Sequence, residues 1–125
     1  MIKTTLGQNL QTTSVLEGKK PLHTAFNDPR ENVNPGEMLA AALGACMMTM
    51  VGFMAAKNGD HAEGTTVEVT PRFDDKHSRI VGFKLECHFP VHFTDAQKEK
   101  YARLAEKCPV HNSLREDMNY EVVIK

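Results

Sequence analysis

Three cysteines carry the most distinctive chemistry in this chain, and their spacing limits what they can do. They stand at positions 46, 87 and 108 and form no C-x-x-C motif. An odd count with these spacings argues against a secreted disulfide framework and against a paired zinc knuckle. We therefore expect each thiol to be either a small apolar core residue or a reactive group in a reducing compartment.

Cys108 stands directly before Pro109, where a short helix is expected to begin. Because proline favours the first helical position, Cys108 is the predicted N-cap. Unpaired N–H groups and the helix dipole at that end favour a thiolate. Cysteine is not among the preferred capping residues, so chemistry is favoured over capping alone. A metal pair of Cys108 and His111 is the weaker alternative, since zinc would need further ligands, and we predict no metal site.

The other two cysteines differ in their surroundings. Cys87 lies between Leu85 and Phe89 on the apolar face of a predicted strand, which indicates core packing. Cys46 follows residues 40–45, which are small except for Leu43 and are expected to leave open space beside its sulfur for a substrate or another backbone. Glu37 lies about two and a half helical turns before Cys46. We predict that Glu37 orients Arg30, from the preceding polar loop, and that Arg30 contacts Cys46.

The bulk composition describes one globular domain over residues 1–125. Hydrophobic residues make up 41% and charged residues 25%, with a net charge of -1. No run of Lys or Arg provides an electrostatic surface for nucleic acid or for an anionic membrane, so neither partner is expected. The first residues lack the apolar core of a signal peptide, which predicts a cytoplasmic protein.

Cys46 lies within one long uncharged segment, and the structure of that segment determines the position of its thiol. From Met38 to Ala56 there is no charged side chain, and Asn34-Pro35 and Asn58-Gly59 supply helix start and stop signals. The segment is long enough to approach a membrane span, but its Ala, Gly and Met content favours a buried helix instead. Its methionines are more typical of core packing than of a copper site. One sheet can cover only one face of such a helix, so we expect a second copy of the chain to cover the other.

The remaining elements predict an α+β domain with antiparallel sheet. Residues 11–16 and 67–73 have strand character, and apolar residues alternate from 81 to 93. Thr94 and Gln97 form a capping box for a helix that runs to about residue 107. Residues 120–124 form a last strand. His88 and His92 lie too far apart along one strand to bind a metal easily together.

Two segments carry a resemblance to a known family. Residues 34–46 read N-P-G-E-M-L-A-A-A-L-G-A-C, and residues 107–110 read K-C-P-V. These segments resemble the N-P-x-E-L-x-x-A-x-x-x-C helix and the downstream C-P motif of the OsmC/Ohr family. The resemblance covers most of the chain, because the order of elements between the two motifs also fits.

This resemblance implies an intertwined homodimer, with antiparallel sheets wrapped around two long central helices. It also implies a thiol-dependent peroxidase of organic hydroperoxides that needs no cofactor. Cys46 would be the peroxidatic thiol, Cys108 the resolving thiol, and Arg30 with Glu37 the polar pair. A dithiol such as a lipoyl group would be the reductant. A helix wall of apolar side chains would favour alkyl or lipid hydroperoxides: Leu39, Leu43, Met47, Met50 and Phe53.

Gly36 marks a departure from the reductases of that family. Their glutamate usually follows Asn-Pro directly, whereas here Gly36 occupies that position and Glu37 comes one residue later. This pattern is more like the OsmC-like branch. Two alternatives therefore stay open: a non-catalytic dimer that binds an apolar ligand or a partner, and a redox-sensing thiol switch.

Overall fold

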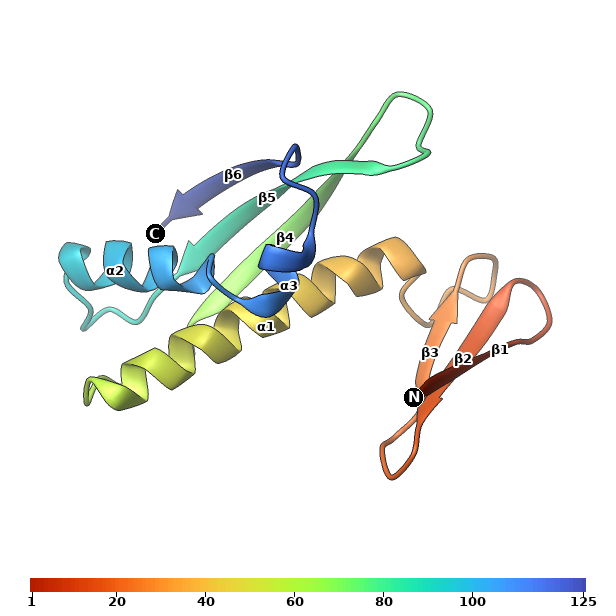
Figure 1. Cartoon of the computed structure of the whole chain (residues 1–125), viewed down its shortest axis with the longest axis horizontal. Coiled ribbons are helices and arrows are strands. Elements are labelled where there is room, and N and C mark those ends of the chain that lie inside the picture. The colour runs from red at the N-terminus through yellow and green to blue at the C-terminus, as the bar shows by residue number, and fades with distance from the viewer. The chain divides into compact units, whose positions relative to one another are not determined.

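The computed structural model describes all 125 residues, which form two compact units, Met1–Leu39 and Ala40–Lys125. The N-terminal unit is built on a three-stranded sheet of β1 (Ile2–Leu6), β2 (Gln11–Leu16) and β3 (Leu22–Ala25) (Figure 1). All its neighbours are antiparallel. β2 has the bounds that its β-branched residues predict. Gly18, with φ of +78°, provides the turn before β3.

The long uncharged segment forms the helix α1 (Pro35–Lys57), which begins in the first unit and continues in the second. Its start is a reciprocal cap: the Glu37 N–H donates to Asn34 Oδ1 at 2.8 Å, and the Asn34 N–H donates to Glu37 Oε1 at 2.9 Å. At the other end Gly59 adopts a φ of +73°. The predicted start and stop signals are both confirmed.

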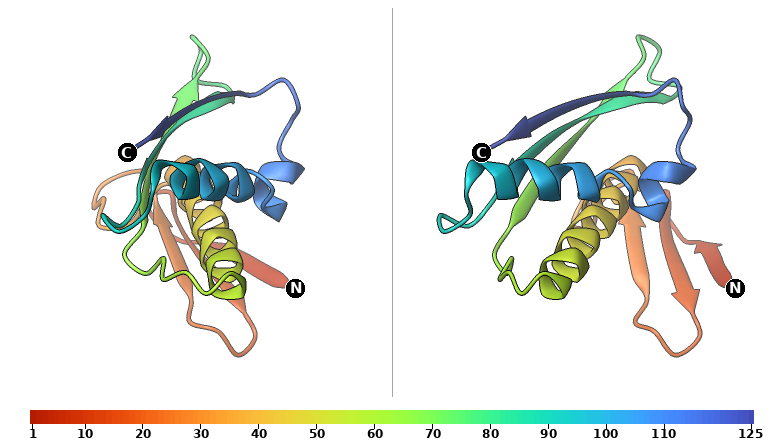
Figure 2. Two further views of the ribbon diagram at one scale, coloured as in Figure 1. Left: turned by 90° about the vertical axis from the view of Figure 1, so that its left-hand side faces the viewer. Right: turned by 60° about the vertical axis from the view of Figure 1, so that its left-hand side comes forward.

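The C-terminal unit places its helices on one face of a second sheet. The strands are β4 (Thr66–Phe73), β5 (Ile80–His88) and β6 (Asn119–Ile124), in that order. Between β5 and β6 the chain forms α2 (Asp95–Ala105) and α3 (Pro109–Ser113). Figure 2 shows α2, α3 and the C-terminal part of α1 on the same side of this sheet. The predicted capping box of Thr94 and Gln97 is present at the start of α2, and the α+β class is confirmed.

The second sheet is mixed rather than wholly antiparallel, which corrects the prediction for this sheet. β4 and β5 are antiparallel, but β5 and β6 are parallel. The physical reason is the crossover: α2 and α3 return the chain to the end of the sheet where β5 began, and a parallel pair needs such a connection. At the start of this pair, Gly82 opposes Asn119, whose carbonyl oxygen would lie 2.1 Å from an added Cβ.

The predicted alternation beyond β5 is also wrong in part. β5 ends at His88, and Val91 is fully exposed rather than on the apolar face. Phe89 and Phe93 remain buried, because their rings pack against each other and Phe93 also packs against Tyr101 of α2. A turn before the helix thus carries the apolar side chains that the sequence pattern assigns to a strand.

The core lies between this sheet and its helices. Along β5, the inward residues Phe83, Leu85 and Cys87 are at most 1% exposed. Gly44 of α1 allows the sheet to approach, since an added Cβ would meet Val69 Cγ2 at 3.2 Å. The helices contribute the other fully covered side chains: Leu43, Met47, Val51, Ala55, Tyr101, Ala105 and Cys108.

Candidate active site

Cys108 occupies the N-cap of α3, as predicted. Its backbone is extended, with φ of -73° and ψ of 151°, and its Sγ accepts a hydrogen bond from the His111 N–H at 3.4 Å. Pro109 follows at the first helical position. Cys108 is 0% exposed. The local C-P sequence thus fixes a buried sulfur at the start of the short helix.

Cys46 lies near Cys108. The Cys46 side chain is close enough to raise the pKa of the Cys108 thiol, although the two residues come from α1 and from the loop before α3. Both are free thiols, and we call them the thiol pair. Within the C-terminal unit the fold therefore brings together two of the four predicted site residues.

The protonation of Cys108 differs from the prediction. Burial raises the pKa of the Cys108 thiol, and the contact with Cys46 raises it further, while the His111 N–H acts in the opposite direction. Desolvation disfavours the thiolate more than the cap favours it. The capping position therefore does not lower the pKa of Cys108 below its ordinary value.

Cys46 lies at the edge between the two faces of α1. Gly44 and Met47 face the sheet and are buried, whereas Ala45 and Thr49 are exposed. Cys46 itself is half-buried. It is thus the more accessible thiol of the pair.

Cys87 is a core residue, as predicted. It is 1% exposed and lies in the middle of the sheet, opposite Val67 of β4 and Ile124 of β6. Burial raises the pKa of its thiol, and the charge of Glu106 raises it further. Both effects keep Cys87 protonated and unreactive.

Arg30 and Glu37 lie in the N-terminal unit, where they line one pocket of about 380 Å³. The predicted ion pair between them is not formed. Arg30 Nε lies 3.7 Å from Asp28 Oδ1, and both side chains are exposed. The Glu37 carboxylate accepts the Asn34 N–H instead, because this position is the third residue of the helix and completes the capping box.

The predicted apolar wall is divided between the core and the surface. Leu43 and Met47 are 0% and 1% exposed and belong to the core under the sheet. Met50 is half-buried, and Phe53 is 62% exposed. By the helical period these residues share one side of α1, but Leu43 and Met47 are covered in the core while Phe53 lies at the exposed edge of that side. Leu39 is half-buried in the N-terminal unit.

Tyr120 is a half-buried residue with a buried hydroxyl that sequence reasoning missed. It stands opposite Phe83 in the parallel pair, and the two rings stack with centroids 5.9 Å apart. Its other neighbour is the His111 ring, at 4.4 Å between centroids. The Tyr120 hydroxyl is buried and has no hydrogen-bond partner. In the sequence, Tyr120 has the pattern of an ordinary strand residue. Only the packed structure shows that its hydroxyl is buried without a partner.

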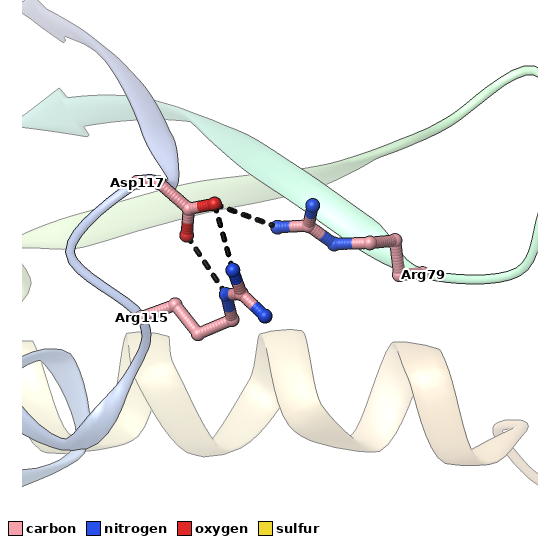
Figure 3. A network of polar contacts seen from close by, with 3 residues as sticks. All are labelled: Arg79, Arg115 and Asp117. Carbon is pink, nitrogen blue, oxygen red and sulfur yellow. Dashed lines mark hydrogen bonds and ion pairs between the residues drawn. The ribbon is translucent and has the colours of Figure 1, made fainter.

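A charged network holds the loop that links α3 to β6. Asp117 binds Arg115, with Nε to Oδ1 at 2.8 Å and Nη2 to Oδ2 at 3.0 Å, and its Oδ2 lies 3.6 Å from Arg79 Nη2 (Figure 3). These hydrogen bonds and positive charges lower the pKa of Asp117. The network fastens this loop next to β5, and the loop leads directly to Tyr120.

On the sheet, Glu68, Glu86 and His88 bring their ligand atoms within 4.8 Å of one another. Glu68 and Glu86 are direct neighbours across β4 and β5. Lys125 Nζ lies 2.8 Å from Glu86 Oε1, so a lysine ammonium already compensates the carboxylate charge. His92 is not part of this cluster, since it lies beyond β5 and its Nε2 bonds the His61 carbonyl at 3.0 Å.

The sheets and helices define an α+β class of protein, with two of its three cysteines close together. A model of OsmC-like proteins matches residues 28–123. The chain therefore belongs to the OsmC-like protein family, as the sequence motifs predict. No curated protein matches the chain.

Solved structures share the fold over nearly the whole chain. A Psychrobacter arcticus 273-4 protein, named for an osmotic stress and detoxification response, is 25% identical with a TM-score of 0.89, covering 99% of this chain and 94% of its own. The Legionella pneumophila organic hydroperoxide resistance protein OsmC is 20% identical, with a TM-score of 0.72 and coverage of 98% and 93%. The Bacillus subtilis organic hydroperoxide resistance protein OhrB is 16% identical, with a TM-score of 0.72 and coverage of 100% and 96%.

Proposed function

We propose that this protein reduces organic hydroperoxides through a thiol–disulfide cycle of Cys46 and Cys108. The observation that carries the proposal is the proximity of these two thiols, one half-buried and one fully buried. Two neighbouring thiols are the arrangement that a disulfide requires. Relatives of the same fold are named as organic hydroperoxide resistance proteins, which agrees with this chemistry.

In the first step the Cys46 thiolate attacks one oxygen of the hydroperoxide. The S–O bond forms as the O–O bond breaks, and the other oxygen leaves as an alkoxide that takes a proton to become the alcohol. Cys46 is thereby oxidised to a sulfenic acid, while the peroxide is reduced by two electrons. Cys46 has this role because it is the accessible thiol of the pair.

In the second step Cys108 resolves the sulfenic acid. Its sulfur, after losing the proton, attacks the Cys46 sulfur; the S–S bond forms, the S–O bond breaks, and the oxygen leaves as water. Rapid disulfide formation protects Cys46 from irreversible overoxidation. A small dithiol, of the lipoyl class, then reduces the disulfide by thiol–disulfide exchange and restores both thiols.

Arg30 and Glu37 are proposed to serve the first step. A guanidinium group can stabilise both a thiolate and a leaving alkoxide. The ion pair of Arg30 with Asp28 is exposed and therefore weak, so it does not hold Arg30 in place. In this proposal Glu37 keeps the helix start in place through Asn34. Its pairing with Arg30 would require the capping hydrogen bond to be exchanged or shared.

We also propose that two copies of the chain cover the open face of α1. This face carries small and apolar residues in the C-terminal unit, with Phe53 62% exposed. Small side chains let two helices pack closely, and water contact with this much apolar surface is unfavourable. The face is formed by Ala41, Ala42, Ala45, Thr49, Gly52, Phe53 and Ala56.

A single-turnover experiment tests the peroxidase proposal. Fully reduced protein is mixed with one equivalent of cumene hydroperoxide or, separately, of hydrogen peroxide, and the products are mapped by non-reducing peptide mass spectrometry. We expect a disulfide between Cys46 and Cys108, faster with the organic peroxide, with Cys87 left free. Cys46→Ser abolishes the reaction, and Cys87→Ser is the matched control that retains it. Thiols that stay unreacted in the wild type would refute the proposal and favour a ligand-binding role.

Sustained turnover separates the peroxidase from a redox switch. With dihydrolipoamide in excess, the peroxidase consumes many equivalents of hydroperoxide per protein. A switch forms the same disulfide but does not cycle. Light scattering at several protein concentrations tests the dimer, and Ala45→Glu, which puts a charge on the proposed interface, is expected to yield monomers. A wild-type protein that is monomeric at micromolar concentration would contradict the dimer.

A further inference from the structure

We propose that the pocket between the C-terminal end of α1 and the helix α2 binds the phosphate group of a small organic phosphate. We call it the α1–α2 pocket, and it is lined by Met54, Asn58, Lys100, Arg103, Leu104 and Lys107. This binding site goes beyond the proposed peroxidase function and does not depend on it.

The first argument is the charge of the lining. Three of the six lining side chains are cations, and none is acidic. Lys100, Arg103 and Lys107 form no ion pair. Arg103 is the only arginine without a carboxylate partner, because an aspartate or glutamate pairs with each of the others: Arg30, Arg72, Arg79 and Arg115. Cations gathered without a counter-charge repel one another, and an anionic ligand would relieve this repulsion.

The second argument is a polar donor held at the pocket. Asn58 follows the last residue of α1, and its Nδ2 donates to the Tyr101 hydroxyl at 3.3 Å. Tyr101 is 0% exposed and its hydroxyl donates to the Asp60 carboxylate, so the phenol is fixed in the core. Lys100 Nζ lies 5.5 Å from the centroid of the same ring. Tyr101 therefore positions both an amide and an ammonium group, and the exposed amide has a second N–H for a ligand.

The helix dipole does not account for all three cations. Positive charge is favourable at the C-terminal end of a helix, where Arg103 and Lys107 lie. Lys100, however, lies in the middle of α2. Lys100 and Arg103 are three residues apart, which places them on one side of the helix, and this side faces Met54 and Asn58 of the α1 end. The cations are thus concentrated on the side of α2 that borders the pocket.

The lining also favours one kind of anion. A phosphate monoester has about two negative charges and three acceptor oxygens, which match several cations and an amide better than a carboxylate does. The planar guanidinium of Arg103 can bind two phosphate oxygens at once. The pocket has a volume of about 460 Å³, which is in the range of small-molecule sites. Met54 and Leu104 add apolar surface, so we expect a phosphate that carries a small apolar group rather than inorganic phosphate.

The α1–α2 pocket does not compete with the proposed dimer. Met54 and Asn58 are four residues apart and share one side of α1. Gly52 and Ala56, which belong to the proposed interface, lie about 200° around the helix from Met54. The pocket should therefore remain open to a ligand when two copies of the chain associate.

Calorimetric titration of the reduced, full-length protein tests the ligand class. Phenyl phosphate, inorganic phosphate and benzoate are each titrated at low ionic strength. We expect phenyl phosphate to bind more tightly than either of the other two, and added sodium chloride to weaken its binding. No binding of phenyl phosphate, or equal affinity for benzoate, would overturn the proposal. Equal affinity for inorganic phosphate would overturn the assignment of an organic phosphate. These titrations contain no peroxide, so the proposed peroxidase function can fail without affecting them.

Variants of α2 test the location of the site. Arg103→Gln should weaken the binding of phenyl phosphate about tenfold, as the loss of a hydrogen bond between charged groups implies. Arg103→Lys keeps the charge but not the planar fork and should lose less affinity. Lys98→Gln is the matched control, because it removes a cation from the same helix that does not line the pocket. Equal losses in Arg103→Gln and Lys98→Gln, or no loss in Arg103→Gln, would overturn the inference.

A second readout keeps the result independent of folding. Arg103 is exposed, so the thermal stability of Arg103→Gln without ligand should equal that of the wild type. In NMR spectra of the wild type, phenyl phosphate should shift the side-chain amide signal of Asn58. The side-chain amide signal of Asn112, which does not line the pocket, serves as the control. An unchanged Asn58 signal at saturating phenyl phosphate would place the ligand elsewhere and overturn the proposed site.

Discussion

The sulfur of Cys108 caps α3 by accepting the His111 N–H at 3.4 Å, and the nearby Cys46 side chain raises the pKa of the same thiol. Cys108 Sγ therefore has one neighbour that caps the helix, the His111 N–H, and one with which it is proposed to react, Cys46. Oxidation to a disulfide with Cys46 would keep this sulfur near the helix end but remove its charge and its S–H. The capping contact thus limits how far Cys108 can move when it reacts.

The three thiols are expected to differ in reactivity in the native protein. Cys46 is half-buried, whereas Cys87 and Cys108 are 1% and 0% exposed and have raised pKa values. A short exposure to iodoacetamide at pH 7.5 should modify Cys46 first, and peptide mass spectrometry measures the order. In denaturant all three should react at similar rates. Preferential labelling of Cys87 in the native state would contradict the observed packing.

Glu37 can be tested separately as a cap and as a catalytic group. Glu37→Gln keeps an oxygen that can accept the Asn34 N–H, so thermal stability should remain nearly unchanged. Asn34→Ala removes the acceptor of the Glu37 N–H and should lower the free energy of unfolding by about 1 kcal/mol.

Peroxidase activity then shows whether Glu37 has a catalytic role besides its role as a cap. If the carboxylate charge orients Arg30, Glu37→Gln loses peroxidase rate at constant stability. If Glu37 acts only as a cap, the glutamine variant retains full activity and Asn34→Ala loses stability alone. Chemical denaturation and initial-rate assays on the same preparations measure both quantities.

Gly82 should not tolerate a side chain. A Cβ at this position would lie 2.1 Å from the Asn119 carbonyl oxygen, which is backbone and cannot rotate away. Gly82→Ala should therefore displace the start of β6 and reduce the free energy of unfolding by about 3 kcal/mol. Gly7→Ala is the matched control, because its added Cβ would meet only Gln11 O at 3.4 Å. Equal stability of the two variants in urea denaturation would refute the close approach.

Asp117 should make stability depend on pH at the acid end. Its pKa is lowered by the hydrogen bonds and charge of Arg115, with a further contribution from Arg79. A carboxyl group with a lowered folded-state pKa stabilises the fold above its unfolded-state value and loses this effect as the pH falls through the folded-state pKa. Asp117→Asn should therefore be less stable than the wild type at pH 7. The difference should begin to shrink as the pH falls below the ordinary value of 3.8 and vanish once the pH is below the lowered folded-state pKa. A difference that is already lost well above pH 3.8 would argue against the ion pair.

Local signals in the sequence determine most of the secondary structure. Asn34-Pro35 and Asn58-Gly59 set the ends of α1, the Thr94 capping box starts α2, and Pro109 starts α3 with Cys108 as its cap. Each depends on residues within one or two turns, so the sequence alone is sufficient. The family resemblance likewise depends on two short motifs, and the family match confirms it.

The tertiary structure decides what depends on contacts between distant segments. The parallel partner of β5 follows from how α2 and α3 return the chain to the sheet. The surface position of Val91 and the unpaired hydroxyl of Tyr120 depend on how their neighbours pack. The protonation of Cys108 is decided in the same way. The capping position predicts a thiolate, but burial depends on the whole core, and here desolvation outweighs the local dipole.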